Sequence, residues 1–193
     1  HYTLLSLIFL ALSLMMKSIP LLEIETLKFF NSLMFNETFF SYFTEIGNGL
    51  ICLAITIPLL SLISHKTTLN NVKAQTLVFV GIGVGVIVKG LKELTSIYAV
   101  RPGYYEFDDI VYLEPIYSFS SFPSGHAATM FSLFFVWISL SFRNIKIKYA
   151  GFLINMILLF VLLVSLSRVV VAAHWLSDVL GSIAIAFLTL NAI

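Results

Sequence analysis

Residues 118–140 read SFSSFPSGHAATMFSLFFVWISL, so the polar sequence Pro123-Ser124-Gly125-His126 opens a long apolar run. A helix needs about 20 mostly apolar residues to cross a bilayer, and the run over residues 124–142 therefore predicts a membrane-spanning helix. A helix that only crosses lipid has no need of an imidazole near its N-terminus. The polar residues there predict a site to which other segments of the chain contribute.

The composition indicates a membrane protein. The chain has 193 residues, of which 59% are hydrophobic and only 11% charged, and its mean hydropathy is +0.99. Soluble domains carry about 25% charged residues. A net charge of +1 without a basic cluster gives no indication of nucleic-acid binding. The single cysteine, Cys52, excludes an internal disulfide and a cysteine-ligated metal site.

Apolar runs predict an all-α fold, with about six membrane-spanning helices in one bundle that forms a single domain over residues 1–193. The candidate spans are residues 2–16, 47–64, 75–98, 124–142, 149–167 and 174–192. The first lacks the basic start and the cleavage site of a signal peptide, which favours a retained anchor. The mixed polar and aromatic residues 21–49 have helical spacing and suit a helix at the membrane interface.

Charged residues orient this bundle. The connections at 65–73 and 143–148 contain five Lys or Arg residues and no acid. The loop at 102–122 contains four acids, Glu106, Asp108, Asp109 and Glu114, and no Lys or Arg. The positive-inside rule therefore places the two basic connections in the cytoplasm and the acidic loop outside. With six spans, both termini are expected in the cytoplasm.

Four polar clusters lie at the ends of spans that this threading brings to the outer side. They are Arg101 at the end of the third span, Ser124-Gly125-His126 at the start of the fourth, Arg168 at the end of the fifth, and His174 with Asp178 at the start of the sixth. Ionisable residues within membrane segments are costly and by default mark function. We expect the clusters to form one site at the outer membrane–water interface.

Each cluster has a chemical and a structural interpretation. His174 and Asp178 are four residues apart, so on a helix they share a face, where a carboxylate makes the far imidazole nitrogen more nucleophilic. Alone, they could be a buried polar pair, Arg168 could reach to the interface, and Pro-Ser-Gly-His could only start a helix. Together, two arginines, a serine, helix-start amides and two histidines favour a binding site for a tetrahedral oxyanion.

Two other chemistries fit less well. No cluster offers three or four metal ligands, so we expect no metal ion in the site. An acyl-transfer site with Ser124 as nucleophile and His126 as base is conceivable. Two arginines suit a phosphate better than an ester carbonyl.

The three motifs resemble the signature of the type 2 phosphatidic acid phosphatase superfamily, the membrane lipid phosphate phosphatases that share their site with vanadium haloperoxidases. The motifs are Arg101-Pro102, PSGH at 123–126 and SRVVVAAHWLSD at 167–178, within a core of about residues 75–192. The second and third match in full. In the first, Leu94 occupies the position of the family's lysine. We expect Lys92 to replace it through a two-residue insertion in residues 95–100, with Lys89 or no lysine as the alternatives.

The resemblance implies a role for each residue. His174 would attack phosphorus and form a phosphohistidine, with Asp178 orienting it. His126 would protonate the leaving group and later activate water. The residues expected to bind the substrate phosphate are Arg101, Arg168, Ser124, Gly125, Lys92 and Pro123. No cofactor is expected.

The resemblance predicts a lipid phosphate phosphatase in a bacterial inner membrane, with its site facing the periplasm or exterior and with the lipid substrate and the bilayer as its partners. The family's substrates include undecaprenyl diphosphate, phosphatidylglycerophosphate, phosphatidic acid and lipid A. A lipid-to-lipid phosphotransferase would use the same site, and a non-catalytic lipid-binding or transport protein is the remaining alternative. Haloperoxidase activity is not expected, because those relatives are soluble. The loop at 103–122 is expected either to cover the entrance to the site or to form an interfacial aromatic belt.

Overall fold

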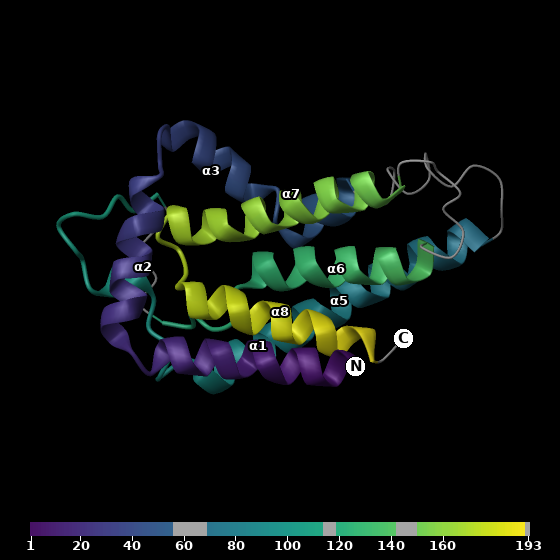
Figure 1. Ribbon diagram of the computed structural model, residues 1–193, viewed down its shortest axis with the longest axis horizontal. Coiled ribbons are helices and arrows are strands. Elements are labelled where there is room, and N and C mark those ends of the chain that lie inside the picture. The colour runs from purple at the N-terminus through teal and green to yellow at the C-terminus, as the bar shows by residue number, and fades with distance from the viewer. Residues whose placement is uncertain (56–68, 114–118, 142–149, 192–193) are drawn as a thin grey trace.

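The computed structural model describes residues 1–55, 69–113, 119–141 and 150–191, and in these ranges it contains helices and no strand (Figure 1). The helices are α1 (Tyr2–Lys17), α2 (Pro20–Ser32), α3 (Glu37–Glu45), an unlabelled helix Gly49–Ile55, α5 (Leu69–Thr95), the 3-10 turn η1 (Pro102–Tyr104), α6 (Gly125–Ser141), α7 (Ala150–Val170) and α8 (Leu176–Leu190). The all-α prediction is confirmed.

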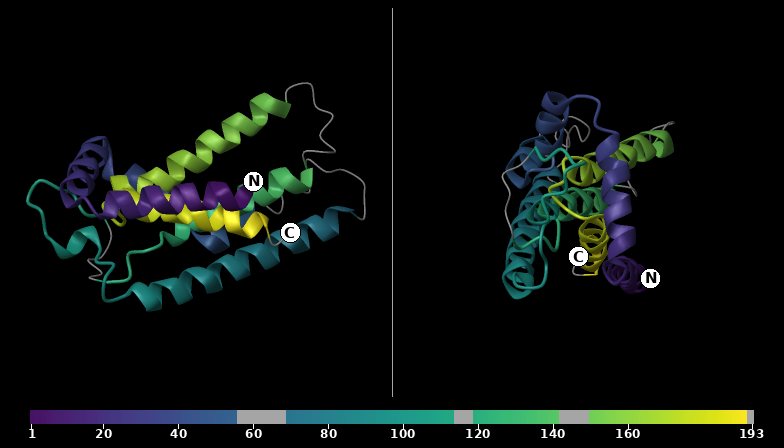
Figure 2. Two further views of the ribbon diagram at one scale, coloured as in Figure 1. Left: turned by 60° about the horizontal axis from the view of Figure 1, so that its bottom comes forward. Right: turned by 90° about the vertical axis from the view of Figure 1, so that its left-hand side faces the viewer.

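Five apolar helices, α1, α5, α6, α7 and α8, run lengthwise through the molecule, and α2 crosses one end of them (Figures 1 and 2). Ala74–Thr95 and Gly151–Val170 are each long and apolar enough to span a bilayer. Up to four spans result if each bent helix pair counts as one, and α6 and α8 are shorter apolar helices. The chain is an integral membrane protein.

The predicted spans correspond to these helices with shifted ends. α5 begins at Leu69 rather than at residue 75, and α8 begins at Leu176 rather than at 174. The predicted span 47–64 is seen as a helix from Gly49 to Ile55, and its remainder lies outside the described residues. Most of the two basic connections, and Glu114, also lie outside them.

Residues 21–49 form two short helices rather than one. Pro20 begins α2, because proline fits the first turn of a helix, where its missing N–H is not needed. The axis of α2 is bent by 97° from that of α1. Asn36 begins α3, and its side-chain oxygen accepts a hydrogen bond from the Phe39 amide at 2.8 Å. Pro20 thus separates α2 from α1, and Asn36 starts α3 as a second short helix.

Helix α8 lies at the centre of the contacts that build the site. α1 packs along it: Ser6 Oγ donates to the Ala184 carbonyl at 2.9 Å, and Ser13 Oγ donates to the Ser177 carbonyl at 2.7 Å. On α8, a Cβ at Gly181 would lie 2.2 Å from the Phe122 ring. Glycine at 181 therefore lets the segment before α6 press directly onto α8.

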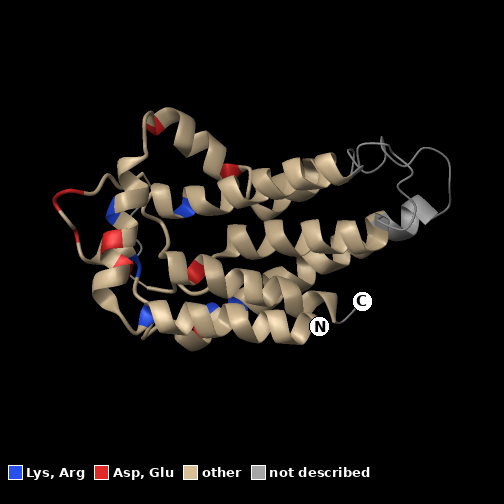
Figure 3. Ribbon diagram, in the orientation of Figure 1, with Lys and Arg blue, Asp and Glu red and all other residues tan. Residues whose placement is uncertain are grey.

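Charged residues gather at the end of the bundle where α2 lies, and the middles of the apolar helices carry few of them (Figure 3). There the acidic loop is fastened to α2. Lys28 Nζ lies 2.8 Å from Asp109 Oδ2, and this hydrogen bond lowers the pKa of Asp109. The Asn31 amide nitrogen donates to the carbonyls of Val111 and Val170 at 2.9 and 2.8 Å, which joins the loop to the end of α7.

Candidate active site

The connection between α7 and α8 holds the third motif in a tight turn. The backbone amides of Ala173 and His174 both donate to the Arg168 carbonyl, at 3.0 and 3.1 Å. The Trp175 indole donates to the Val100 carbonyl at 2.7 Å, which ties the residue before Arg101 to the start of α8. The first and third motifs are thereby brought to the same end of the bundle.

His174 and Asp178 are in contact and almost fully buried, with relative side-chain exposures of 2% and 0%. His174 Nδ1 lies 3.4 Å from Asp178 Oδ2, a long hydrogen bond of the kind that catalytic groups tighten when substrate binds. The expectation that they share a helix face is wrong, because His174 precedes the first residue of α8. Asp178 instead caps the helix by accepting from the Trp175 amide at 3.0 Å, and this turns its carboxylate back towards His174.

Two residues that the sequence did not single out complete the surroundings of Asp178. Ser121 Oγ donates to Oδ2, the oxygen that faces His174. Lys17 Nζ, from the end of α1, donates to Oδ1 at 3.3 Å. Both oxygens of this buried carboxylate therefore accept hydrogen bonds, as a buried charge requires.

The second motif starts α6 beside this carboxylate. The Ser124 amide donates to the Asp178 carbonyl at 3.4 Å, and Ser182 Oγ bridges the carbonyls of Ser124 and Asp178 at 2.9 and 2.7 Å. Pro123 is buried. Ser124 is also fully buried, and its Oγ has no hydrogen-bond partner among the described residues. The hydrogen-bonding capacity of this hydroxyl is therefore not used by the described residues.

Gly125 is the first residue of α6, and the first amides of a helix have no intrahelical acceptor. A Cβ at Gly125 would meet Val88 Cγ1 at an ordinary 3.6 Å, and the residue does not have a positive φ. Neither packing nor backbone conformation requires glycine here. A ligand that closely approaches the Gly125 amide would account for it.

His126 lies one residue further along α6, facing α3 and the turn after it. Its Nε2 is 4.0 Å from Glu45 Oε1, and a Cβ at Gly47 would lie 3.0 Å from His126 Cβ. The charges of Arg168, Lys92 and Arg101 act on this imidazole, as does His174. His126 thus has both the predicted cations and the second histidine as electrostatic neighbours.

The two arginines come from different parts of the chain. Arg168 is 2% exposed, and its guanidinium donates to Thr44 Oγ1 on α3 at 2.9 Å. Arg101 is half-buried and immediately precedes η1. Thr44 is a further residue that the sequence did not indicate. Its bond fixes the guanidinium of Arg168 before any ligand binds.

The end of α5 bears on which lysine belongs to the first motif. The helix stops at Thr95, so residues 96–100 have the freedom that a two-residue insertion needs. Lys92 is half-buried, its Nζ donates to the Ser120 carbonyl at 3.0 Å, and its charge acts on both histidines. Lys89 is exposed, and Leu94 is 78% exposed. Of the three positions, only Lys92 is connected to the site by these contacts.

The electrostatics of the site favour a neutral His174. This residue lies in the connection between α7 and α8, outside both helices. Burial lowers its pKa well below the usual value, the hydrogen bond and charge of Asp178 oppose this shift, and the charges of Lys92 and Arg101 add to it. A neutral imidazole with Nδ1 facing a carboxylate presents Nε2 as its free lone pair.

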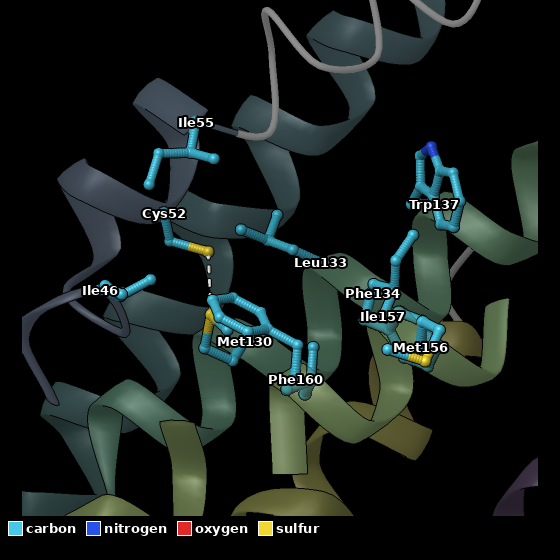
Figure 4. Close-up of a pocket in the computed structure, with 11 residues that line it drawn as sticks. Ile46, Cys52, Ile55, Met130, Leu133, Phe134, Trp137, Met156, Ile157 and Phe160 are labelled. Atoms are coloured by element: carbon cyan, nitrogen blue, oxygen red, sulfur yellow. Dashed lines mark hydrogen bonds between the residues drawn. The ribbon is translucent and has the colours of Figure 1, made fainter. Parts of the chain in front are cut away.

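An apolar cavity of about 250 Å³ lies between α6, α7 and the helix Gly49–Ile55 (Figure 4). Ile46, next to Gly47, is one of the lining residues, and Met130 lies one helical turn after His126 on α6. The aromatic side chains of Phe134, Trp137 and Phe160 also line it. Cys52 is buried in its wall, with Sγ 3.3 Å from Met130 Sδ, in agreement with a packing role for this cysteine.

Among residues 1–55, 69–113, 119–141 and 150–191, no three His, Cys, Asp or Glu side chains are grouped so that they could hold a metal ion. The residues predicted to bind phosphate supply hydrogen-bond donors: a hydroxyl, helix-start amides, two guanidinium groups and an ammonium group. Such a set can bind a phosphoryl group through several of its oxygens.

A protein-family model described as the PAP2 superfamily matches residues 73–193. The chain belongs to the PAP2 superfamily. The resemblance seen in the three motifs is thereby confirmed. A search of curated protein sequences finds no match for this PAP2 protein.

Two solved structures share the fold. The LpxE of Aquifex aeolicus is 22% identical, with a TM-score of 0.64, and the alignment covers 89% of this chain and 96% of that one. A transmembrane PAP2-type phosphatidylglycerolphosphate phosphatase from Bacillus subtilis is 20% identical, with a TM-score of 0.68, over 99% of this chain and 94% of that one. The similarity extends over the N-terminal helices, which the family model does not include.

Proposed function

We propose that this PAP2 protein is a membrane phosphatase that hydrolyses a lipid phosphate or diphosphate through a phosphohistidine intermediate, without a metal ion. The contact between His174 Nδ1 and Asp178 carries the proposal, because it leaves Nε2 available to attack a phosphate bound by the hydrogen-bond donors of the three motifs. The site faces the periplasm or exterior of a bacterial inner membrane in this proposal, supported by the charges of the loops.

Binding uses the donors around the second motif. The phosphoryl oxygens accept hydrogen bonds from Ser124 Oγ, the Gly125 amide and the guanidinium groups of Arg101 and Arg168, and Lys92 adds a positive charge. Pro123 sets the path of the chain into this loop. These donors are fixed by burial and by contacts such as that of Arg168 with Thr44. They therefore stabilise the negative charge of the transition state at little cost of rearrangement.

In the first step, His174 Nε2 attacks phosphorus while the bond from phosphorus to the leaving oxygen breaks. The leaving oxygen takes a proton from His126, and Asp178 stabilises the positive charge that develops on His174. In the second step, His126 accepts a proton from water, whose oxygen attacks phosphorus, and the bond from His174 to phosphorus breaks. Inorganic phosphate leaves, and both imidazoles return to their starting forms.

The apolar cavity supports a lipid as the substrate. It is lined by apolar side chains (Figure 4), and one of them, Met130, lies one helical turn after His126 on α6. A phosphate bound at the mouth of α6 would place the first part of an attached hydrocarbon chain at this cavity. Its fit to a hydrocarbon follows from the favourable transfer of methylene groups out of water.

The proposal predicts phosphate release from a lipid in the presence of EDTA. Purified protein in detergent would be given undecaprenyl diphosphate, phosphatidylglycerophosphate, phosphatidic acid and lipid A in turn, and inorganic phosphate would be measured. Release from at least one lipid at an unchanged rate in EDTA is the expected result. Transfer of phosphate to an added acceptor lipid instead of water would identify a phosphotransferase, and loss of all activity in EDTA would contradict metal independence.

Lys92 and Lys89 provide a matched pair for the first motif. Lys92→Ala is expected to lower kcat/KM about 10- to 100-fold, because a charge that faces the phosphoryl group is lost from a low-dielectric site. Lys89→Ala removes the same charge from the exposed side of the same helix and is expected to change kcat/KM by less than about 2-fold. Steady-state kinetics on the preferred lipid compare them. The reverse order would show that Lys89 serves the motif.

A further inference from the structure

The first helix of the bundle reaches the catalytic carboxylate from the side opposite His174. Lys17, in the last turn of α1, places Nζ 3.3 Å from Asp178 Oδ1, although the two residues are 161 positions apart. The other oxygen, Oδ2, accepts from Ser121 and faces His174 Nδ1. Lys17 Nζ also lies 5.2 Å from the centre of the Phe122 ring. The lysine is thus held between α8 and the segment that leads into the second motif.

The position of Lys17 is fixed by the docking of its helix. Ser6 and Ser13 anchor α1 to α8 through hydrogen bonds to backbone carbonyls, and Phe9 stacks on Phe187 with ring centres 5.7 Å apart. The side chain of Lys17 is 33% exposed, whereas that of Asp178 is fully buried. An ion pair on a protein surface loses side-chain entropy when it forms. The packing of α1 on α8 reduces this loss for Lys17, because it holds the lysine next to the buried carboxylate of Asp178.

The ion pair of Lys17 with Asp178 matters because few other charged groups among the described residues lie near this buried carboxylate. The charged or titratable groups that face Asp178 are Lys17 from α1, Glu23 from α2 and His174 from the connection before α8. Glu23 is itself only 7% exposed and lies near both Asp178 and Lys17. While His174 is neutral, Lys17 is the cation of this group. A buried carboxylate that lacks a partner charge takes up a proton or turns towards water.

We propose that Lys17 is a positioning residue of the active site, which keeps Asp178 ionised and turned so that Oδ2 faces His174 Nδ1. This role rests on the proposed function. A protonated or rotated Asp178 would no longer accept from Nδ1–H, and His174 would lose the tautomer that leaves Nε2 free. Lys17 lies outside residues 73–193, so the part of the chain matched by the family model does not contain it.

The test compares three variants of Lys17 with a docking control, using the lipid that the wild type hydrolyses. Lys17→Met is expected to lower kcat about 10- to 100-fold with KM within about 2-fold, as is common for partners that orient a functional histidine. Lys17→Gln keeps a hydrogen-bond donor without the charge and should lose a similar factor. Lys17→Arg should restore most of the kcat. In the Met and Gln variants, the acid limb of the pH profile of kcat should move to higher pH.

The control is Ser13→Ala, which removes an α1–α8 hydrogen bond and leaves the charges around Asp178 unchanged. It is expected to lower the unfolding temperature in detergent while kcat stays within about 2-fold of the wild type. Wild-type kcat and an unmoved acid limb in both neutral variants would overturn the proposal, and so would an equal loss of kcat in Ser13→Ala. A wild type that releases phosphate from no lipid would instead overturn the proposed function.

Discussion

Replacing His174 by alanine is expected to lower phosphate release by at least about 10⁴-fold, which is the scale on which removal of a catalytic nucleophile acts. The attacking nitrogen disappears, while the donors around Ser124 and the arginines remain. Since Asp178 still has Lys17, Ser121 and the Trp175 amide as partners, the variant should fold. Phosphate release from the preferred lipid and the unfolding temperature in detergent measure the two effects separately.

The intermediate gives a second test of the same residue. A lipid labelled with ³²P in the reactive phosphate should leave label on the wild-type protein after rapid quenching. The label should survive alkali and be lost in acid, because it is held by a phosphorus–nitrogen bond. No label should remain on His174→Ala. Turnover at the wild-type rate, or an unchanged label, in this variant would show that another residue attacks phosphorus.

Replacing His126 by alanine is expected to slow hydrolysis of a lipid phosphate about 10²- to 10⁴-fold, the usual contribution of a general acid–base group. An alkoxide is a poor leaving group and needs the proton from His126. p-Nitrophenolate leaves without one, so p-nitrophenyl phosphate should still phosphorylate His174 in the variant. Water attack would then be slow. A burst of p-nitrophenol followed by a slow steady rate, with phosphoprotein accumulating, is the expected time course in rapid-mixing experiments.

Glu45→Gln is the matched control for this experiment. Glu45 lies 4.0 Å from His126 Nε2, and the substitution removes its charge while preserving its shape. It should give neither the burst nor the accumulation of phosphoprotein. If His126→Ala slowed the lipid and p-nitrophenyl phosphate equally and no phosphoprotein accumulated, the assignment of His126 as proton donor and water-activating base would be wrong.

Much of the fold and the convergence of the polar clusters could be predicted because both depend on local patterns. Apolar runs defined most of the helices, and alternation of spans placed the clusters at one end. The contact of His174 with Asp178 was also expected, but for the wrong geometric reason. Their spacing suggested one helix face, whereas the structure uses the capping of α8 by Asp178, which depends on where that helix starts.

Lys17, Thr44 and Ser121 could not be predicted, because their roles come from contacts between segments far apart in the sequence. Thr44 meets Arg168 across 124 positions, and Ser121 meets Asp178 across 57. Nothing in the local sequence of a threonine in an amphipathic helix signals an arginine partner. The lysine of the first motif is an intermediate case. The family's spacing points to Leu94, and Lys92 was expected only through a two-residue insertion, with which the end of α5 at Thr95 is compatible.

The pairing of α1 with α8 also has a consequence for biosynthesis. Of the helices described here, α1 leaves the ribosome first and α8 last, yet Asp178 needs both of them for its hydrogen bonds. Chains grow at about 5 to 20 residues per second, so α1 has to wait many seconds in the membrane before its partner arrives. During that time the polar side chains of Ser6, Ser13 and Lys17 lack their final partners on α8. A nascent chain therefore has no functional site to expose, and phosphatase activity can begin only when translation of α8 is complete.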